Sequence, residues 1–319
     1  MSSVDVPAIC GATVEKKKQA QMLDDGETVT YKHVGDLAIR ADISMPAGAG
    51  PHPVIVFIHG GALILGSRRW IDPIQRASYL RDGFTVVSID YRLAPEAKLA
   101  AIVSDLDDAV AWVRGVGGRQ FHLDPRRVAV VGHSAGGYLA LLAGVRVQPR
   151  LQALVSFYGY GDITGQWYAR PDPFYLGKPL VAEADAWAGV RGAPVSNVEG
   201  SDNDARHRFY LYCRQQGLWP QNVEGHDPAR DPGAFSPYCP VQLVTAAYPP
   251  TLLVHGDRDT DVPYEQSVLM ASALQAAGVT HALITIANGD HGFDHEMDRP
   301  EVASAFEQVR AFLRRHATA

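Results

Sequence analysis

Cysteine is scarce in this chain of 319 residues, which contains only Cys10, Cys213 and Cys239. An odd number of cysteines at so low a density does not indicate a framework of disulfide bonds. Cys213 and Cys239 could pair, but we expect a reduced, cytoplasmic protein.

Basic residues and long apolar runs are also in short supply. The formal net charge is -6, and the only basic run is Lys16–Lys18, which we expect to be solvated. Nucleic acids and anionic membranes both need a basic surface, so neither is expected as the main partner. The longest apolar runs, such as Val54–Ile58, are far shorter than the roughly 20 residues that cross a bilayer. Residues 1–22 also lack the apolar core of a signal peptide.

What remains is the composition of a globular protein with a large core, since 46% of the residues are hydrophobic and 20% are charged. Short runs with strand character alternate with segments of helical length. The first two runs mix polar and apolar residues, as an exposed antiparallel edge does, whereas the later runs are almost continuously apolar, as in a buried parallel sheet. This alternation predicts an α/β fold with right-handed crossovers.

The expected strands are Glu27–Val34, Leu37–Met45, Val54–Ile58, Phe84–Asp90, Val128–Val131, Ala153–Phe157, Thr251–His255 and Ala282–Ile286. The expected helices are Ile102–Arg114, Ser134–Val147, Tyr264–Ala277 and Pro300–Arg315. Residues 161–238 interrupt the alternation, because they hold no clear strand and are rich in aromatic residues and proline. A structureless loop of that length would be abnormal in a compact domain. We therefore predict an inserted cap at 161–238 and a catalytic domain formed by residues 1–160 and 239–319.

The candidate nucleophile is Ser134, at the centre of the pattern G-x-S-x-G in Val128–Gly137. An apolar strand precedes the pattern and a helix rich in alanine and leucine follows it, which disfavours a chance match. In that context the serine occupies a strained strand-to-helix turn that projects its hydroxyl above the sheet. The residues two before and two after it crowd the turn, so Gly132 and Gly136 fit there.

A second glycine pair follows the strand Val54–Ile58, in the sequence His59-Gly-Gly-Ala62. Such a loop can lend backbone N–H groups to the oxyanion that forms during acyl transfer. We expect the N–H groups of Gly61, Ala62 and Ala135 to form this oxyanion hole. The alternative is an ordinary Gly-Gly turn.

A serine nucleophile needs a base, and the base needs a carboxylate that orients it. The chain order serine, acid, histidine places the acid in the loop after Thr251–His255, where Asp257, Asp259 and Asp261 compete. The base would then be His291, which lies beyond the last expected strand.

Two alternatives concern the segment around this histidine. His295 is a rival base, but we expect it on a helical turn that points elsewhere. Asp290, His291, Asp294 and His295 could instead form a metal cluster, although nothing else in the sequence supplies a convincing ligand set.

Together these motifs resemble the hormone-sensitive-lipase-like branch of α/β-hydrolases, a broad group of serine carboxylesterases. The resemblance covers the chain from about Val54 to the C-terminus outside the cap. It is carried by the segments His59–Ala62, Asp90–Glu96, Asp105–Trp112, Gly132–Gly137, His255–Pro263 and His291–Phe293. It implies the α/β-hydrolase fold, a mostly parallel eight-stranded sheet flanked by helices, with no cofactor and no metal.

The resemblance also selects among the three aspartates. In related esterases the arrangement H-G-x-x-D-x-x-V-P puts the acid on the residue that matches Asp259, so Asp257 and Asp261 would shape the loop or lie on the surface. Two features depart from the branch. Ala62 stands at the fourth position of the glycine loop, and the acid loop looks more like that of polysaccharide-side-chain and feruloyl-type esterases.

The implied function is hydrolysis of short-chain or aromatic carboxylic esters through an acyl-enzyme, with a small-molecule ester as the partner. An amidase or formamidase of the same fold is the alternative. A non-catalytic ligand receptor is more remote, because Ser134, Asp259 and His291 are all present. Exposed sheet edges in this fold often pair, so a homodimer is a further expectation.

Overall fold

The computed structural model describes residues 26–190 and 192–318. The N-terminal stretch Met1–Asp25 lies outside these ranges, and so do Cys10 and the basic run Lys16–Lys18. Cys213 and Cys239 are buried and free. Within the two described ranges, no helix combines the length and the apolar character needed to cross a bilayer.

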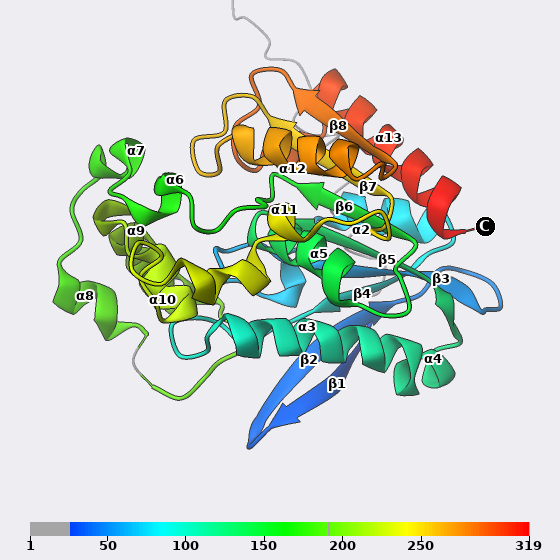
Figure 1. Ribbon diagram of the computed structural model, residues 1–319. Helices are drawn as coiled ribbons and strands as arrows, with labels where there is room; N and C mark the ends of the chain where they lie inside the picture. Colours follow the sequence, from blue (N-terminus) through cyan, green and yellow to red (C-terminus); the bar gives the residue numbers. More distant parts are fainter. Residues whose placement is uncertain (1–25, 191, 319) are drawn as a thin grey trace, which may run out of the picture.

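An eight-stranded sheet forms the centre of the molecule, in the order β1-β2-β4-β3-β5-β6-β7-β8 (Figure 1). The strands are β1 (Glu27–Val34), β2 (Leu37–Ser44), β3 (His52–Ile58), β4 (Thr85–Ile89), β5 (Leu123–His133), β6 (Ala153–Phe157), β7 (Thr251–Gly256) and β8 (His281–Ile286). The pairs β1–β2 and β2–β4 are antiparallel, and all the other neighbouring strands are parallel. The predicted mostly parallel sheet of eight strands is therefore confirmed, with β1 at its antiparallel edge.

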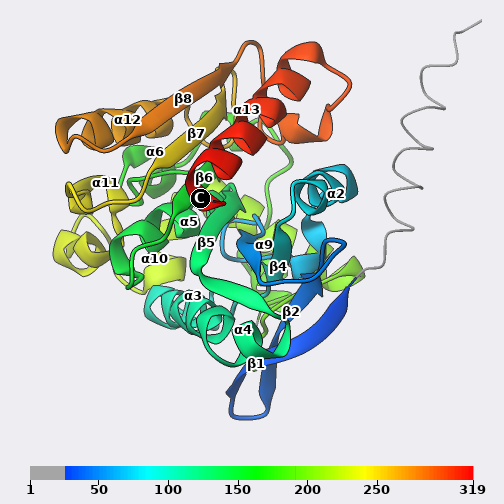
Figure 2. The ribbon, with the colours of Figure 1, turned by 90° about the vertical axis from the view of Figure 1, so that its right-hand side faces the viewer.

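Helices cover both faces of the sheet because each buried strand presents apolar side chains alternately to the two sides. In β3, Val54 and Val56 belong to one core and Ile55 and Phe57 to the other. Figure 2 shows α2 and α13 on one side of the sheet and α3, α5 and α12 on the other. These helices are α2 (Pro73–Arg81), α3 (Leu99–Arg114), α5 (Ala135–Arg146), α12 (Glu265–Ala276) and α13 (Pro300–Ala317).

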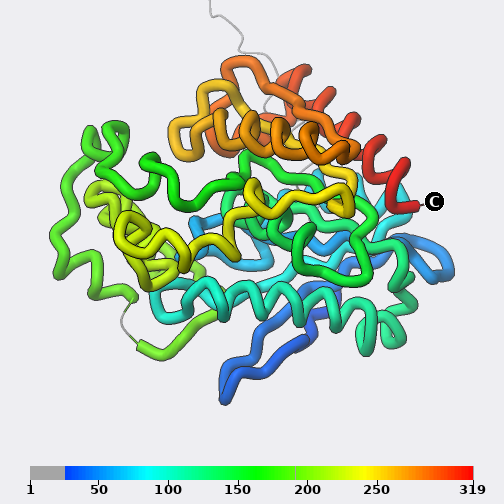
Figure 3. Tube along the Cα trace, in the orientation of Figure 1, coloured from blue at the N-terminus to red at the C-terminus, as the bar shows by residue number. Residues whose placement is uncertain are grey.

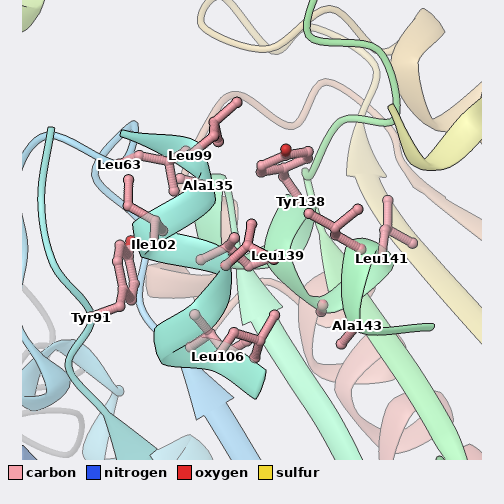
Figure 4. Close-up of a cluster of buried hydrophobic side chains, with 14 of the residues drawn as sticks. Leu63, Tyr91, Leu99, Ile102, Leu106, Ala135, Tyr138, Leu139, Leu141 and Ala143 are labelled. Atoms are coloured by element: carbon pink, nitrogen blue, oxygen red, sulfur yellow. The ribbon is translucent and has the colours of Figure 1, made fainter. Parts of the chain in front are cut away.

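The larger core lies where α3 meets α5. Figure 4 shows Leu99, Ile102 and Leu106 of α3 beside Ala135 and Leu139 of α5. All five side chains are fully buried. Burying a leucine or isoleucine side chain contributes about 1.5–3 kcal/mol, so this contact fixes the helix that follows the candidate nucleophile.

The four predicted helices are present, with ends that differ by up to three residues, but the sequence pattern predicts neither α2 nor α4 (Val116–Gln120). A start signal for α2 does exist: Asp72 accepts a hydrogen bond from the N–H of Ile74 at 2.7 Å, and Pro73 opens the helix. The helix that follows is largely polar, so its hydrophobic periodicity is too weak to reveal it.

Five short helices and one long helix, α9, but no strand, occupy the described residues between 161 and 238. They are α6 (Gln166–Ala169), α7 (Pro173–Leu176), α8 (Glu183–Ala188), α9 (Gly200–Gln216), α10 (Trp219–Glu224) and η2 (Pro232–Tyr238), and they gather at one side of the molecule (Figure 3). Their buried residues, including Phe209 and Trp219, belong to the same core as α3 and α5. The assignment of this segment as an inserted cap stays a prediction.

Candidate active site

Ser134 stands between the end of β5 and the start of α5, in a backbone conformation that few residues adopt. Its φ is 54° and its ψ is -118°. The turn closes only because its flanking residues lack side chains. A Cβ on Gly132 would lie 2.0 Å from the carbonyl oxygen of Gly136, and a Cβ on Gly136 would lie 2.1 Å from that of Ile58. Close packing of the turn against the first turn of α5 and the end of β3 thus holds the strained serine in place.

The three side chains proposed as a triad form one continuous line. Nδ1 of His291 lies 2.7 Å from Oδ2 of Asp259, and Nε2 lies 3.1 Å from Oγ of Ser134. A carboxylate can only accept a hydrogen bond, so Nδ1–H donates to Asp259. In the neutral imidazole this leaves Nε2 free to accept the serine proton. The geometry is that required of a nucleophile, a base and an orienting acid.

Asp259 is fixed through both of its oxygens. Oδ1 accepts hydrogen bonds from the backbone N–H groups of Asp261 and Val262, each at 2.8 Å. Oδ2 lies 3.2 Å from Nε2 of His255 in addition to its contact with His291. Burial by itself would raise the pKa of Asp259, but the hydrogen bonds from the two histidines lower it well below its usual range. Asp259 therefore stays a carboxylate at physiological pH.

His255 is a partner that the sequence analysis does not single out. It lies at the end of β7, fully buried, with Nδ1 2.7 Å from Oγ of Ser267. The signal for it is present in the segment His255–Pro263, where it stands four residues before Asp259.

The two other aspartates of the acid loop have different surroundings. Oδ1 of Asp257 accepts a hydrogen bond from the N–H of Asn288 at 2.7 Å, which joins the acid loop to the loop that carries His291, outside the lining of the pocket. The expectation that Asp261 merely shapes the loop or lies on the surface is wrong. Its Oδ2 lies 3.5 Å from Nε2 of His291, and its side chain lines the same pocket as Ser134. A long-range fold contact determines this position, and the local sequence carries no sign of it.

This arrangement changes the basicity of His291. Burial lowers the pKa of the imidazole, but the negative charge of Asp261, the hydrogen bond to Asp259 and the charges of Asp259 and Asp294 together raise it to about 9. The free enzyme therefore holds an imidazolium at neutral pH.

The loop that carries His291 is anchored by a buried carboxylate. Asp294 is 1% exposed and accepts a hydrogen bond from the hydroxyl of Tyr158, whose ring lies 4.6 Å from that of His291. His295 does lie on a helical turn, η3 (Phe293–His295), but it lines the pocket instead of pointing elsewhere. Among the residues that the structure describes, no group of three or more His, Cys, Asp or Glu side chains is arranged to hold a metal ion.

The glycine loop after β3 lies beside the nucleophile. A Cβ on Gly60 would lie 3.2 Å from the Cβ of Ser134, and Gly61 and Ala62 have positive φ angles of 101° and 54°. Neither of the backbone N–H groups of Gly61 and Ala62 donates a hydrogen bond within the described ranges. Ala135 is the first residue of α5, so its N–H has no partner four residues earlier in the helix. Gly61 and Ala62 line the same pocket as Ser134, and the role of the three N–H groups as an oxyanion hole stays a prediction.

A pocket of about 260 Å³ is lined by Ser134. Residues of the segment between 161 and 238 and residues outside that segment both contribute to its walls. Tyr175 and Tyr210 come from the segment between 161 and 238, while Tyr158 and His291 come from loops at the carboxyl edge of the sheet. The indole Nε1–H of Trp219 donates to the carbonyl oxygen of Ala62 at 2.8 Å, so the same segment also supports the glycine loop.

Comparisons with known proteins agree with this architecture. The model of a family described as "alpha/beta hydrolase fold" matches residues 55–295. The non-reducing polyketide synthase ausA of Aspergillus calidoustus is 31% identical over 91% of this chain, a match that covers 14% of that protein. The chain spans about one seventh of the length of the curated relatives it matches.

Solved structures share the fold at lower identity. An alpha/beta hydrolase superfamily protein from Enterococcus faecalis gives a TM-score of 0.72 at 22% identity, covering 91% of this chain and 99% of that one. A thermophilic esterase from the Planctomycetes species Thermogutta terrifontis gives 0.61 at 22% identity, covering 92% and 93% of the two chains.

Replacing Gly136 by alanine tests the crowding of the turn. Because the new Cβ would lie 2.1 Å from a backbone oxygen, we expect the free energy of unfolding to fall by about 3 kcal/mol. Urea titration measures this loss. Gly192→Ala is the control, since no heavy atom lies within 4 Å of its added Cβ. Equal unfolding midpoints for the two variants would contradict the crowded turn.

The raised basicity of His291 predicts an alkaline pH profile. Only the neutral imidazole can accept the serine proton, so the rate of Ser134 labelling by a fluorophosphonate should rise with pH and be half-maximal near pH 9. By linkage, this group contributes stability that is complete below its unfolded pKa of 6.5 and is lost as pH rises through about 9.

The same profile tests the role of Asp261. Asp261→Asn removes the largest of the charges that raise this pKa and should move the profile to lower pH, whereas Asp257→Asn should leave it in place. A parent protein whose labelling rate does not change between neutral and alkaline pH would refute the raised pKa of His291.

Proposed function

This chain belongs to the α/β-hydrolase fold family, and on that premise we propose that it is a serine carboxylesterase that acts through an acyl-enzyme. The observation that carries the proposal is the unbroken line of hydrogen-bond contacts from Asp259 through His291 to Ser134, at 2.7 Å and 3.1 Å. A buried acid, a histidine and a strained serine in this order are the parts that acyl transfer needs.

The first half of the proposed reaction forms the acyl-enzyme. Nε2 of His291 takes the proton of Ser134 as Oγ attacks the ester carbonyl. The resulting oxyanion is received by the N–H groups of Gly61, Ala62 and Ala135, and each such donor contributes on the order of 100- to 1000-fold in rate. The tetrahedral intermediate then collapses, and His291 protonates the departing alcohol oxygen as the C–O bond breaks.

In the second half, water takes the place of the alcohol. His291 removes a proton from the water as it attacks the acyl carbon, and the same donors receive the second oxyanion. Collapse releases the carboxylic acid and returns the proton to Oγ of Ser134. Asp259 keeps the imidazole in one orientation throughout and stabilises its charged form.

The walls of the pocket support a preference for short or aromatic acyl groups. The pocket holds about 260 Å³, and Phe57, Tyr158 and Tyr175 contribute aromatic rings to it. A small cavity of this kind leaves little room for a long acyl chain, while aromatic walls favour flat apolar groups.

Turnover of p-nitrophenyl acetate and butyrate tests the proposal directly. Ser134→Ala should lower kcat by about a thousandfold or more, because removal of the nucleophile disables the whole triad. Ser272→Ala is the matched control, since this exposed hydroxyl on α12 only caps a backbone carbonyl. Equal turnover by the Ser134→Ala variant and the parent protein would end the proposal.

The leaving group separates an esterase from an amidase. An oxygen ester, a thioester and an anilide with the same acetyl group should be compared under one set of conditions. We expect the two esters to react faster than the anilide, whose nitrogen must be protonated before it leaves. A faster anilide would assign the site to an amidase instead.

A further inference from the structure

The carboxylate of Asp261 has two oxygens in unequal surroundings. Oδ1 accepts a hydrogen bond from the hydroxyl of Tyr175 at 2.7 Å, another from the hydroxyl of Tyr210, and a third from Nη1 of Arg214 at 2.7 Å. All three donors come from the segment between 161 and 238. Oδ1 is therefore saturated, and the carboxylate is held at a fixed angle.

Oδ2 faces the pocket. It lies 3.5 Å from Nε2 of His291, and no residue in the described ranges donates a hydrogen bond to it. The Asp261 side chain is 19% exposed and lines the same pocket as Ser134. A carboxylate oxygen has two lone pairs, so Oδ2 can accept hydrogen bonds from a bound molecule.

The negative charge of Asp261 is held between Arg214 and His291. Arg214 is 1% exposed and divides its guanidinium between Asp261 and Asp172, which lies 2.5 Å from Nη2. Two carboxylates thus share this guanidinium, and the charged form of His291 lies 3.5 Å from Oδ2 of Asp261. A rigid, partly desolvated anionic acceptor binds a donor more strongly than a mobile surface carboxylate does.

The distance from Nε2 defines which part of a substrate would meet Oδ2. During acyl transfer Nε2 hands its proton to the oxygen of the departing alcohol, so that oxygen must lie within hydrogen-bond distance of it. Oδ2 lies on the same side of the imidazole, only 3.5 Å from that atom. A hydroxyl on the carbon adjacent to the one that bears the ester oxygen is therefore within reach of Asp261.

We propose that Asp261 is a specificity-determining residue which accepts a hydrogen bond from a hydroxyl of the alcohol moiety, so that the preferred substrates are esters of vicinal polyols. This inference rests on the esterase function proposed above and names its substrate class. Glycerol and sugars share the required 1,2-arrangement of oxygens. Simple alcohols lack it, and their esters leave the partly buried acceptor without a donor from the substrate, which costs free energy.

Matched esters test this preference without any variant. 2-Hydroxyethyl acetate and 2-methoxyethyl acetate differ only in whether the second oxygen can donate. For the parent protein we expect kcat/KM, measured by titration of released acid, to favour the hydroxyl ester by about 10- to 100-fold, the range for a hydrogen bond to a charged group. Both substrates meet the same free enzyme, so the ionisation of His291 cancels from the ratio.

The variant Asp261→Asn then locates the acceptor. Its neutral side chain should lower the ratio to within about threefold of unity, because the hydrogen bond is no longer made to a charge. Asp257→Asn, a carboxylate of the same loop outside the pocket, should keep the parent ratio. Circular dichroism checks that both variants fold. If Asp261→Asn does not fold, the kcat/KM ratio of the parent protein alone tests the preference for a hydroxyl.

Two outcomes overturn the inference while leaving the esterase proposal intact. One is a ratio near unity for the parent protein. The other is an Asp261→Asn variant that slows both esters equally and keeps the parent ratio, which would show that Asp261 only positions His291. Failure of the esterase proposal would look different, since Ser134→Ala would then match the parent on every ester.

A last comparison identifies the source of the polyol. Glycerol 1-acetate and a methyl xyloside that carries one acetyl group beside a free hydroxyl should each be hydrolysed faster than their O-methylated counterparts. The larger kcat/KM of the two assigns the site to a glycerol ester or to a sugar ester. No advantage over the methylated forms for either substrate overturns the inference.

Discussion

The proposed chemistry depends on one geometric constraint, which is that neighbouring parallel strands end at the same edge of a sheet. Ser134 follows β5, Asp259 follows β7 and His291 follows β8, and these strands pair in parallel through β6. Residues more than a hundred positions apart in the sequence therefore meet because the strands that precede them are neighbours in the sheet. The burial of the mostly apolar central strands keeps this edge rigid, so distances of about 3 Å can be maintained between separate loops.

A second constraint comes from α9, which touches the site from two directions. Nη1 of Arg206 donates to the carbonyl oxygens of Ile64 and Ala94, each at 2.9 Å, and so supports the chain beyond the glycine loop. Arg214, two helical turns later, binds Asp261 in the acid loop. Both guanidinium groups are buried, and a buried cation without its partners would be strongly destabilising. The helix therefore joins the side of the pocket formed by the glycine loop to the side that holds His291.

The sequence predicts those parts of the site that impose strict local demands on the backbone. The turn at Ser134 tolerates only glycine at two flanking positions, and a loop that exposes N–H groups needs glycines of its own, so short motifs reveal them. His255 and Asp261 could not be assigned in this way. Their roles depend on which atoms face them in space, and a partner such as Arg214 comes from a segment of the chain with no motif at all. Helix α2 could not be predicted for a different reason. Its sequence is largely polar and lacks the hydrophobic periodicity that marks a buried helix.

Asp261 has different effects on His291 in the free protein and in the proposed complex with a substrate. In the free protein its charge helps to raise the pKa of His291 to about 9, so the imidazolium predominates at neutral pH. Such a base would be poorly suited to neutral conditions. A hydroxyl that donates to Oδ2 would draw part of that negative charge away from Nε2 and so favour the neutral imidazole in the complex. A polyol ester would then both fill the vacant acceptor and release the base, whereas a simple ester would leave His291 in its charged form.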